Sequence, residues 1–339
     1  MAEDRYDPDA KVDDEMDTVA RLIRTAGRRS DPPAEAFEQT FATATEAWRI
    51  KVRRRRETHR FAAIAASLVI VCSGALLIAN LTREPAPSVA RADRLIGTVE
   101  IRSGASGDWS TLRDEAIQLA AGSHLRTHAG SRAGIVLDTG VSVRLADATN
   151  VVLESGSSLR LVTGKVYLDS GDTGRDAQRI QVITPAGTAR DVGTQFEVLY
   201  RDEAYRLRVR DGRVLLSRDA GDITGGAGDQ LTIDESGGLE RTRIARDDSE
   251  WQWVESVAPA PDIDEQPLTV LLEWVASETG RAVAFDKPEV ERKATTTILH
   301  GSIRNLTPLE ALSVMLATTD LEYVLPDDGT ILIRLKVTR

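Results

Sequence analysis

The sequence predicts a multi-domain protein with four parts: a short α-helical cytoplasmic arm, one transmembrane helix, an all-β domain of the sandwich or solenoid-like kind, and a small α+β domain. Three observations support this organisation. A long uncharged run covers residues 61–82, short alternating runs fill residues 93–253, and helical periodicity returns within residues 266–339. A chain of 339 residues has room for two or three domains.

The composition excludes several classes of protein. A net charge of −10 argues against general nucleic-acid binding, so we expect no nucleic-acid partner. The single cysteine, Cys72, excludes an internal disulfide framework and a cysteine-rich metal site. His124 and His128 have the spacing of a helical metal site, but the stretch around them predicts strand or turn, where that spacing does not converge. We therefore expect neither a metal ion nor a cofactor.

Residues 1–60 are predicted to form a helical arm that needs a partner. One short amphipathic helix ends near Gly27, and a second apolar stripe follows it. Two such helices cannot build a core of their own, so their apolar faces require the membrane surface, a second copy or another protein. We favour a protein because the second stripe carries large aromatic residues. The predicted contact residues are Leu22, Ile23, Phe37, Phe41 and Trp48.

Residues 61–82 form the only long uncharged run and are predicted to cross the membrane as a helix. About 20 residues span the ~30 Å hydrocarbon layer, and buried core helices rarely run this long without a charge. A cleaved signal peptide would begin nearer the start of the chain. The basic residues before the run place residues 1–60 in the cytoplasm and 83–339 outside it, with 83–92 as a linker. These basic residues are Lys51, Arg53, Arg54, Arg55, Arg56 and Arg60.

Residues 93–253 are predicted to form the all-β domain. Short runs of alternating apolar residues follow one another, with turn residues between them and no convincing amphipathic helix. Asp211-Gly212 predicts a hairpin between two of these runs. The stretches 136–145 and 162–168 are expected to form hairpins of the same kind. Strands at this spacing favour a sandwich, a barrel or a solenoid-like stack.

A linker over residues 254–265 leads to the small α+β domain, residues 266–339. Its first helix carries apolar residues on one face and ends at Gly280. Its second helix begins at Thr307, which forms a capping box with Glu310. Short strands are expected at 282–285 and 296–303 and a hairpin around 326–329, which gives the order α-β-β-α-β-β.

One motif raises the possibility of an enzyme. Asp-Thr-Gly occurs at 138–140 after an apolar pair and again at 172–174, and aspartic proteases use this motif twice. The two copies lie too close together for a two-lobed enzyme, although a single-lobed dimeric protease needs only one copy. Because 138–140 lies where a hairpin turn is needed, we favour a turn and expect no enzymatic activity.

The stretch TPAGTARDVGTQFEV, residues 184–198, is rich in turn residues and raises the question of a phosphate-binding loop. A phosphate cradle needs a helix N-terminus after its glycines. Here the chain enters another strand that includes Phe196, and no lysine follows Gly193. We therefore predict a corner between strands of the β domain.

The same stretch, extended to Ile183, closely resembles the signature of FecR-type periplasmic domains. In that signature a strand runs into Thr-Pro, a Gly-Thr-Ala turn, then Gly-Thr and Phe-x-Val. The stretches 134–153 and 159–169 resemble the upstream hairpins of the same family, and 266–333 resembles the secretin/TonB short N-terminal (STN) domain. The residues that match the FecR signature are Thr184, Pro185, Gly187, Thr188, Gly193, Thr194 and Phe196.

This resemblance implies a transmembrane sensor of the inner membrane that acts as an anti-sigma regulator. The cytoplasmic arm would bind an extracytoplasmic-function sigma factor, and the periplasmic part would bind the signalling domain of a TonB-dependent outer-membrane receptor, as in ferric-siderophore uptake. It also implies an intramembrane protease acting near Ser73-Gly74. The arm departs from the best-known members, because Trp48 is its only tryptophan. The alternative is a structural or ligand-binding envelope protein that uses these domains without a sigma factor.

Overall fold

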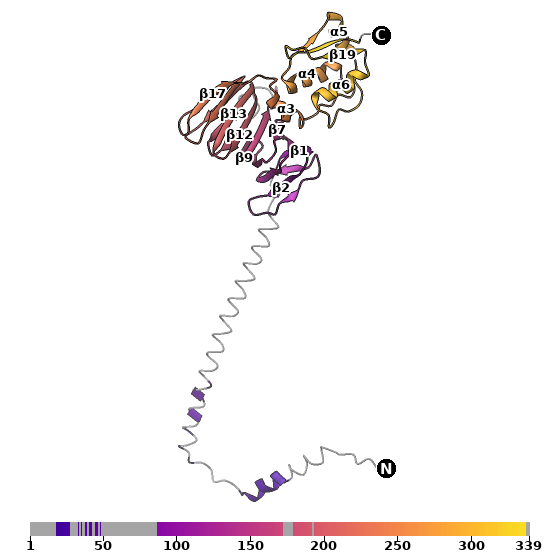
Figure 1. Cartoon of the computed structure of the whole chain (residues 1–339). Helices are drawn as coiled ribbons and strands as arrows, with labels where there is room; N and C mark the ends of the chain where they lie inside the picture. Colours follow the sequence, from indigo (N-terminus) through magenta and orange to yellow (C-terminus); the bar gives the residue numbers. More distant parts are fainter. Residues whose placement is uncertain are drawn as a thin grey trace, which may run out of the picture. The chain divides into compact units, whose positions relative to one another are not determined.

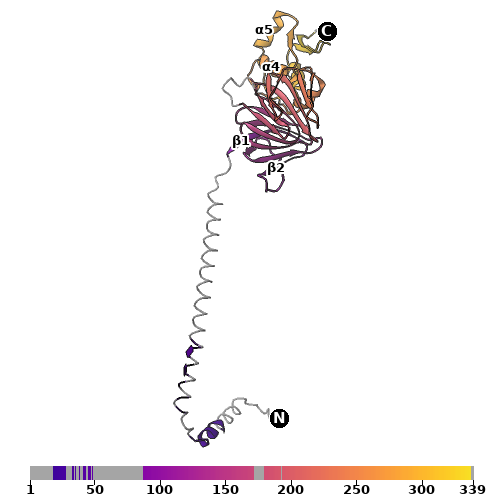
Figure 2. The same cartoon turned by 90° about the vertical axis from the view of Figure 1, so that its left-hand side faces the viewer.

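The computed structural model describes residues 18–27, 33, 35, 38, 41, 42, 45, 46, 48, 87–171, 179–191 and 193–336. The chain divides into an N-terminal unit, residues 1–84, and a second unit, residues 85–339. Figure 1 and Figure 2 show the whole chain from two sides. Among the described residues no helix is long and apolar enough to cross a membrane, and the predicted span 61–82 lies outside them.

The described residues of the N-terminal unit are mostly helical. Residues 18–25 form a helix, and the N–H of Ala26 donates to the carbonyl of Leu22 over 3.0 Å. Gly27 follows with φ +70°, a left-handed conformation that ends the helix where the sequence predicts. Further helical residues are Glu35, Glu38, Phe41, Ala42, Thr45, Glu46 and Trp48.

The β domain, residues 88–243, contains two sheets that share strand β9 and enclose one apolar core. All strand neighbours are antiparallel except β9 and β10. The first sheet has the spatial order β4 (Gln118–Ala120), β1 (Ser88–Ile96), β6 (Arg132–Leu137), β7 (Ser142–Leu145), β9 (Ser158–Asp169), β12 (Gln195–Arg201), β13 (Ala204–Asp211), β16 (Asp229–Ile233) and β17 (Leu239–Arg243). The second sheet has the order β3 (Ser110–Thr111), β2 (Val99–Ser103), β5 (Ser123–Thr127), β8 (Asn150–Ser155), β9, β10 (Gln181–Thr184), β11 (Gly187–Asp191), β14 (Arg213–Ser217) and β15 (Ile223–Gly226).

Strand β9 passes from the second sheet into the first at a glycine. Residues 158–163 pair with β8, whereas residues 164–169 pair with β12. Gly164 has φ +106°, and a Cβ at this position would lie 2.5 Å from the Cα of Thr149. Both the left-handed conformation and the close approach of the neighbouring backbone require glycine here.

Two of the three hairpins predicted in the β domain are wrong. Asp211-Gly212 joins β13 to β14, which lie in different sheets. A Cβ on Gly212 would lie 2.3 Å from the carbonyl oxygen of Gly193, so the glycine allows two corners to approach closely. The stretch 162–168 is the middle of β9. The stretch 136–145 does form the predicted hairpin, between β6 and β7.

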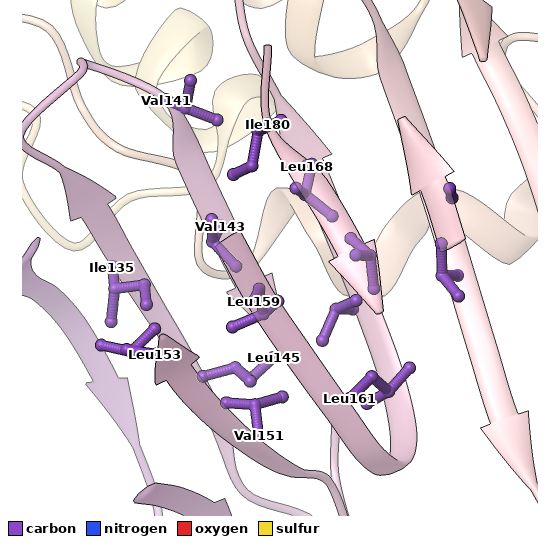
Figure 3. Packing of buried hydrophobic residues seen from close by; sticks show 14 of the residues in the cluster. Ile135, Val141, Val143, Leu145, Val151, Leu153, Leu159, Leu161, Leu168 and Ile180 are labelled. Atoms are coloured by element: carbon purple, nitrogen blue, oxygen red, sulfur yellow. The ribbon is translucent and has the colours of Figure 1, made fainter. Parts of the chain in front are cut away.

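The core of the β domain lies between the two sheets. Ile135, Val143 and Leu145 of the first sheet face Leu153 and Leu161 of the second, and all five are buried (Figure 3). Alternate residues point inward along strands such as β5, β8 and β16, which is the pattern that the sequence predicts for a sandwich. The all-β character of this domain is therefore confirmed, with strands that alternate in short groups between the two sheets.

The C-terminal domain, residues 263–336, packs helices α4 and α6 against a small mixed sheet around its own apolar core. The sheet has the order β18-β20-β19, with β18 parallel to β20. The predicted capping box is confirmed: the Glu310 carboxylate accepts from the N–H of Thr307 (2.9 Å) and from its hydroxyl (2.8 Å). The elements are α4 (Leu268–Thr279), β18 (Val283–Phe285), α5 (Pro288–Thr296), α6 (Pro308–Ala317), β19 (Leu321–Val324) and β20 (Ile331–Leu335).

One strand predicted in this domain is wrong and one helix is additional. Helix α5 begins with proline and carries acidic residues in its first turn, both of which favour a helix start. Its Val290 is buried in the core. The strand expected at 296–303 is reduced to an isolated bridge between Ile298 and Pro267. The observed order is therefore α-β-α-α-β-β.

Both segments that the sequence predicts as linkers contain packed residues. Strand β1 begins at Ser88, inside the expected linker 83–92. The junction segment, residues 244–262, contains η1 (Ser249–Trp251) and α3 (Gln252–Glu255), and it continues into the expected linker 254–265. Val257 and Ala258 within it are buried. The two domains of the second unit are thus joined by a structured connection.

Replacing Gly164 with alanine should destabilise the β domain by at least about 2 kcal/mol, because the strained conformation and the contact with Thr149 act together. Gly156→Ala is the matched control, since the nearest atom to a Cβ there is the Val89 carbonyl oxygen at 3.9 Å. Urea denaturation followed by tryptophan fluorescence measures both variants. Equal stabilities for the two variants would contradict the proposed role of Gly164.

Candidate functional site

Four of the five predicted partner contacts on the N-terminal arm are described, and all four are exposed. The exposed fractions are 66% for Leu22, 69% for Ile23, 65% for Phe41 and 66% for Trp48. Phe37 lies outside the described residues. Apolar side chains with this exposure are available to a partner, and their role as contacts stays a prediction.

The FecR-like signature begins with a tight hairpin between β10 and β11. Thr184 pairs with Gly187, and the hydroxyl of Thr184 donates to the carbonyl of Gly187 over 2.8 Å. Pro185 lies in the turn between them. A Cβ on Gly187 would lie 2.8 Å from the carbonyl oxygen of Ser217, so β14 leaves room only for glycine. Thr188 continues β11 beside the same strand.

The second half of the signature is the corner where the chain passes from the second sheet to the first. Gly193 has φ +73°, and the N–H of Thr194 donates to the hydroxyl of Ser170 over 2.7 Å. Strand β12 follows, and Phe196 is fully buried in the core. No helix begins here, so the prediction of a corner between strands is confirmed and the backbone lacks the geometry of a phosphate cradle.

A buried glutamate in the signature binds the junction segment to the first sheet. Glu197 lies on the outer face of this sheet and is fully buried. Its carboxylate accepts from the Nε1 of Trp253 (3.1 Å) and lies 3.2 Å from the guanidinium of Arg206 and 3.7 Å from the Nζ of Lys165. Lys165 also lies 4.7 Å from the ring of Trp253. Trp251 and Trp253 both pack in the buried apolar cluster of the junction.

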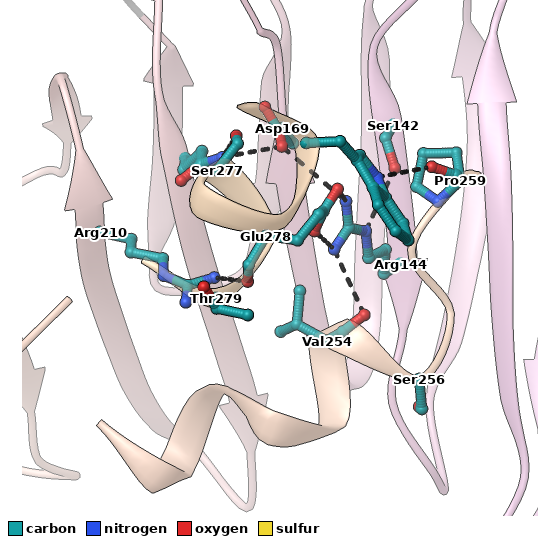
Figure 4. Close-up of polar contacts among 12 residues, drawn as sticks. Ser142, Arg144, Asp169, Arg210, Val254, Ser256, Pro259, Ser277, Glu278 and Thr279 are labelled. Carbon is teal, nitrogen blue, oxygen red and sulfur yellow. Dashed lines mark hydrogen bonds and ion pairs between the residues drawn. The ribbon is translucent and has the colours of Figure 1, made fainter. Parts of the chain in front are cut away.

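A buried ion pair joins the β domain to the C-terminal domain. Arg144, on the outer face of β7, donates two hydrogen bonds to the Glu278 carboxylate at the end of α4, over 2.6 and 2.7 Å (Figure 4). The exposed fractions of the two side chains are 0% and 4%. Burial lowers the pKa of Arg144, but the Glu278 carboxylate together with Tyr167 and Asp169 raises it more, so the net pKa lies above the ordinary value. Arg144 is therefore charged, and the pair is held out of water.

A second arginine, Arg210 of β13, binds the same end of α4. Its Nη1 donates to the main-chain carbonyl of Glu278 (2.8 Å), and its Nε donates to the carbonyl of Arg246 (2.7 Å). Next to this pair, Gln195 donates to the hydroxyl of Ser277 over 3.1 Å. Gln195 belongs to the FecR-like signature, which therefore contacts the C-terminal domain directly.

The alternative motifs have structural explanations. Asp138 is exposed in the β6–β7 turn, where the N–H of Gly140 donates to the carbonyl of Leu137 over 2.8 Å. The second Asp-Thr-Gly copy, 172–174, lies outside the described residues. His124 contacts Arg102 on β2, and the Nε2 of His128 lies 2.7 Å from Glu100 on the same strand. No group able to hold a metal ion is found in the part of the chain that the structure describes.

Comparison with known proteins assigns part of this scaffold to a family. Residues 123–215, which run from β5 into β14, match the family model described as FecR protein. The signature hairpin and corner both lie within the matched residues. No curated protein matches the chain.

Two solved structures are similar to the chain. Both are crystal structures of a protein described as a "putative anti-sigma factor" from Parabacteroides distasonis ATCC 8503, at 2.50 Å and 1.65 Å resolution. Each is 15% identical, covers 63% of this chain and 99% of its own, and superposes with a TM-score of 0.35.

Replacing Arg144 with methionine should lower the stability of the second unit by about 3–5 kcal/mol, because the Glu278 carboxylate is then buried without a partner. Arg160→Met is the matched control: its pair with Glu154 is half exposed and should contribute at most about 1 kcal/mol. Urea denaturation measures both. Similar losses in the two variants would show that burial of the Arg144 pair has no special effect.

The carboxyl group of Glu255, at the same junction, is expected to make the stability of the fold depend on pH. Burial raises the pKa of its carboxyl group, and Arg210 only partly offsets this. A raised pKa in the folded state means that stability is lost as the pH rises through that value. Glu255→Gln should therefore melt at a higher temperature than the wild type at pH 7, and the difference should shrink toward pH 4. A variant that melts lower than the wild type at pH 7 would refute this assignment.

Proposed function

We propose that the chain is a single-pass inner-membrane signal transducer that binds and regulates an extracytoplasmic-function sigma factor, without enzymatic activity of its own. The FecR domain at residues 123–215 is the observation that carries this proposal. It fits the resemblance of the signature to FecR-type sensors. In this proposal the uncharged run 61–82 is the span, with residues 1–60 in the cytoplasm and residues 83–339 in the periplasm.

The exposed apolar residues of the arm supply the proposed sigma-factor contact. Leu22 and Ile23 lie on one face of the helix 18–25, while Arg21 and Arg24 project from the opposite side. Large exposed apolar side chains are the groups that dominate protein interfaces once they are buried by a partner. An arm of this kind can bind a sigma factor in one state of the protein. It releases the sigma factor in a second state in which that binding is less favourable.

The C-terminal domain supplies the proposed contact with a TonB-dependent receptor. It is proposed to be an STN-like domain, in agreement with its sequence resemblance. Among the described residues β19 pairs only with β20, so its other edge is open for an extended segment of a partner. A hollow of about 240 Å³ beside that edge is lined by Leu316, Leu321 and Tyr323. Release of the sigma factor, in this proposal, involves an intramembrane protease near Ser73-Gly74.

One observation favours the alternative of a ligand-binding envelope protein. An open hollow of about 790 Å³ lies at the end of the β domain where the turns β10–β11, β12–β13, β14–β15 and β16–β17 meet. Pro185, Tyr200, Arg218 and Asp234 are among the residues that line it. A protein that binds a small molecule there needs no sigma factor, so the two proposals differ in what the arm does.

Co-purification of the full-length chain in detergent with co-expressed extracytoplasmic-function sigma factors distinguishes the two proposals. The wild type should retain a sigma factor, and Leu22→Ala/Ile23→Ala should reduce the amount retained at least about tenfold, since interface anchors each contribute more than about 1 kcal/mol. Arg21→Gln, on the opposite side of the helix, is the matched control and should retain it. Equal retention by all three proteins would refute the arm contact, and no retention by the wild type would favour the envelope protein.

A further inference from the structure

Two buried arginines form a socket on the outer face of the first sheet. Arg144 of β7 and Arg210 of β13 are both almost completely buried. Their guanidinium carbons lie 5.2 Å from the ring of Tyr167 and 5.4 Å from the ring of Trp251, respectively. The aromatic rings orient the two cations and exclude water. The β domain and the junction segment supply every one of these groups, so the C-terminal domain contributes nothing to the socket itself.

The socket holds one carboxylate, that of Glu278, on its Arg144 side. Both carboxylate oxygens accept from Arg144, which also donates to the carbonyl of Val254 over 3.3 Å and lies 3.8 Å from Asp169. Arg210, by contrast, has no carboxylate within 4 Å among the described residues, and its Nη2 is buried without a hydrogen-bond partner. A bidentate arginine is the arrangement that proteins use to bind a free carboxylate.

The contacts that hold α4 in the socket are mainly polar. The apolar cores of the two domains form separate clusters, and Tyr167 and Trp251 pack together in a third cluster that belongs to the β-domain side. Away from the socket, Arg94 of β1 donates to the carbonyls of Asn305 and Leu306 over 2.8 and 3.3 Å. Polar groups are hydrated when such a junction opens, so undocking costs less than the separation of two apolar faces. The junction is therefore suited to reversible docking.

We propose that Arg144 forms a carboxylate-binding site of the β domain, that Arg210 holds the main chain of the residue bound there, and that Glu278 occupies this site as an internal ligand. The C-terminal domain is then held by a contact that another carboxylate, such as an acidic side chain of a partner, can displace. The binding site stands on the geometry alone; only its use in signalling rests on the proposed function.

Removal of the internal ligand tests the site. The full-length Glu278→Ala variant in detergent should melt at a lower temperature than the wild type. Sodium formate should restore at least half of that loss in a saturable manner, while sodium chloride at the same concentration should not. The wild type, whose site is occupied, should respond equally to both salts. The double variant Arg144→Met/Glu278→Ala should show no specific response to formate. If Glu278→Ala does not fold, Glu278→Ser serves instead.

Formate that acts no better than chloride on Glu278→Ala, or equally well on the double variant, would overturn the carboxylate site. Co-purification of a sigma factor with the same Glu278→Ala protein separates this result from the proposed function. Retained sigma factor with no formate effect refutes the site alone. A specific formate effect in a chain whose wild type retains no sigma factor refutes the proposed function alone.

Discussion

Strand β9 belongs to both sheets, and the geometry of the β domain depends on its bend. Before the bend Leu159 and Leu161 face the core, and after it Val166 and Leu168 do. The inward positions thus change from odd to even numbers at Gly164, where φ is +106°. This one-residue shift keeps apolar residues inside on both sheets while the strand crosses between them. The outer face of the first sheet, on which the C-terminal domain docks, is set by the same shift.

The chain uses different chemistry inside its domains and between them. Each domain is held by its own cluster of apolar side chains, which fixes its fold irrespective of the other. The junction instead relies on arginine, glutamate and main-chain carbonyls, with Arg144 and Glu278 at its centre. Buried charges add little net stability but tolerate few alternative partners. Such a junction therefore specifies one docking geometry and adds little to the strength of docking.

Local patterns in the sequence predicted the elements that depend on neighbouring residues. The alternating strands, the β6–β7 turn and the capping box at Thr307 are of this kind, and all three are confirmed. The hairpin expected at Asp211-Gly212 is wrong. The turn forms as expected, but the strands on its two sides belong to different sheets. Arg144 and Glu278 are separated by 134 positions, and the sequence stretches that contain them do not indicate that the two residues pair. Contacts at that separation depend on the tertiary fold, so the sequence alone offered no signal for them.

The position of β1 has a mechanical consequence. This strand is the first folded element after residue 87, yet it lies inside the first sheet, between β4 and β6. A pull on the chain from its N-terminal side is therefore carried by hydrogen bonds to two neighbouring strands rather than one. An edge strand in this place would peel away under load. Tension applied at the start of β1 is thus transmitted to the interior of the sheet before any strand detaches.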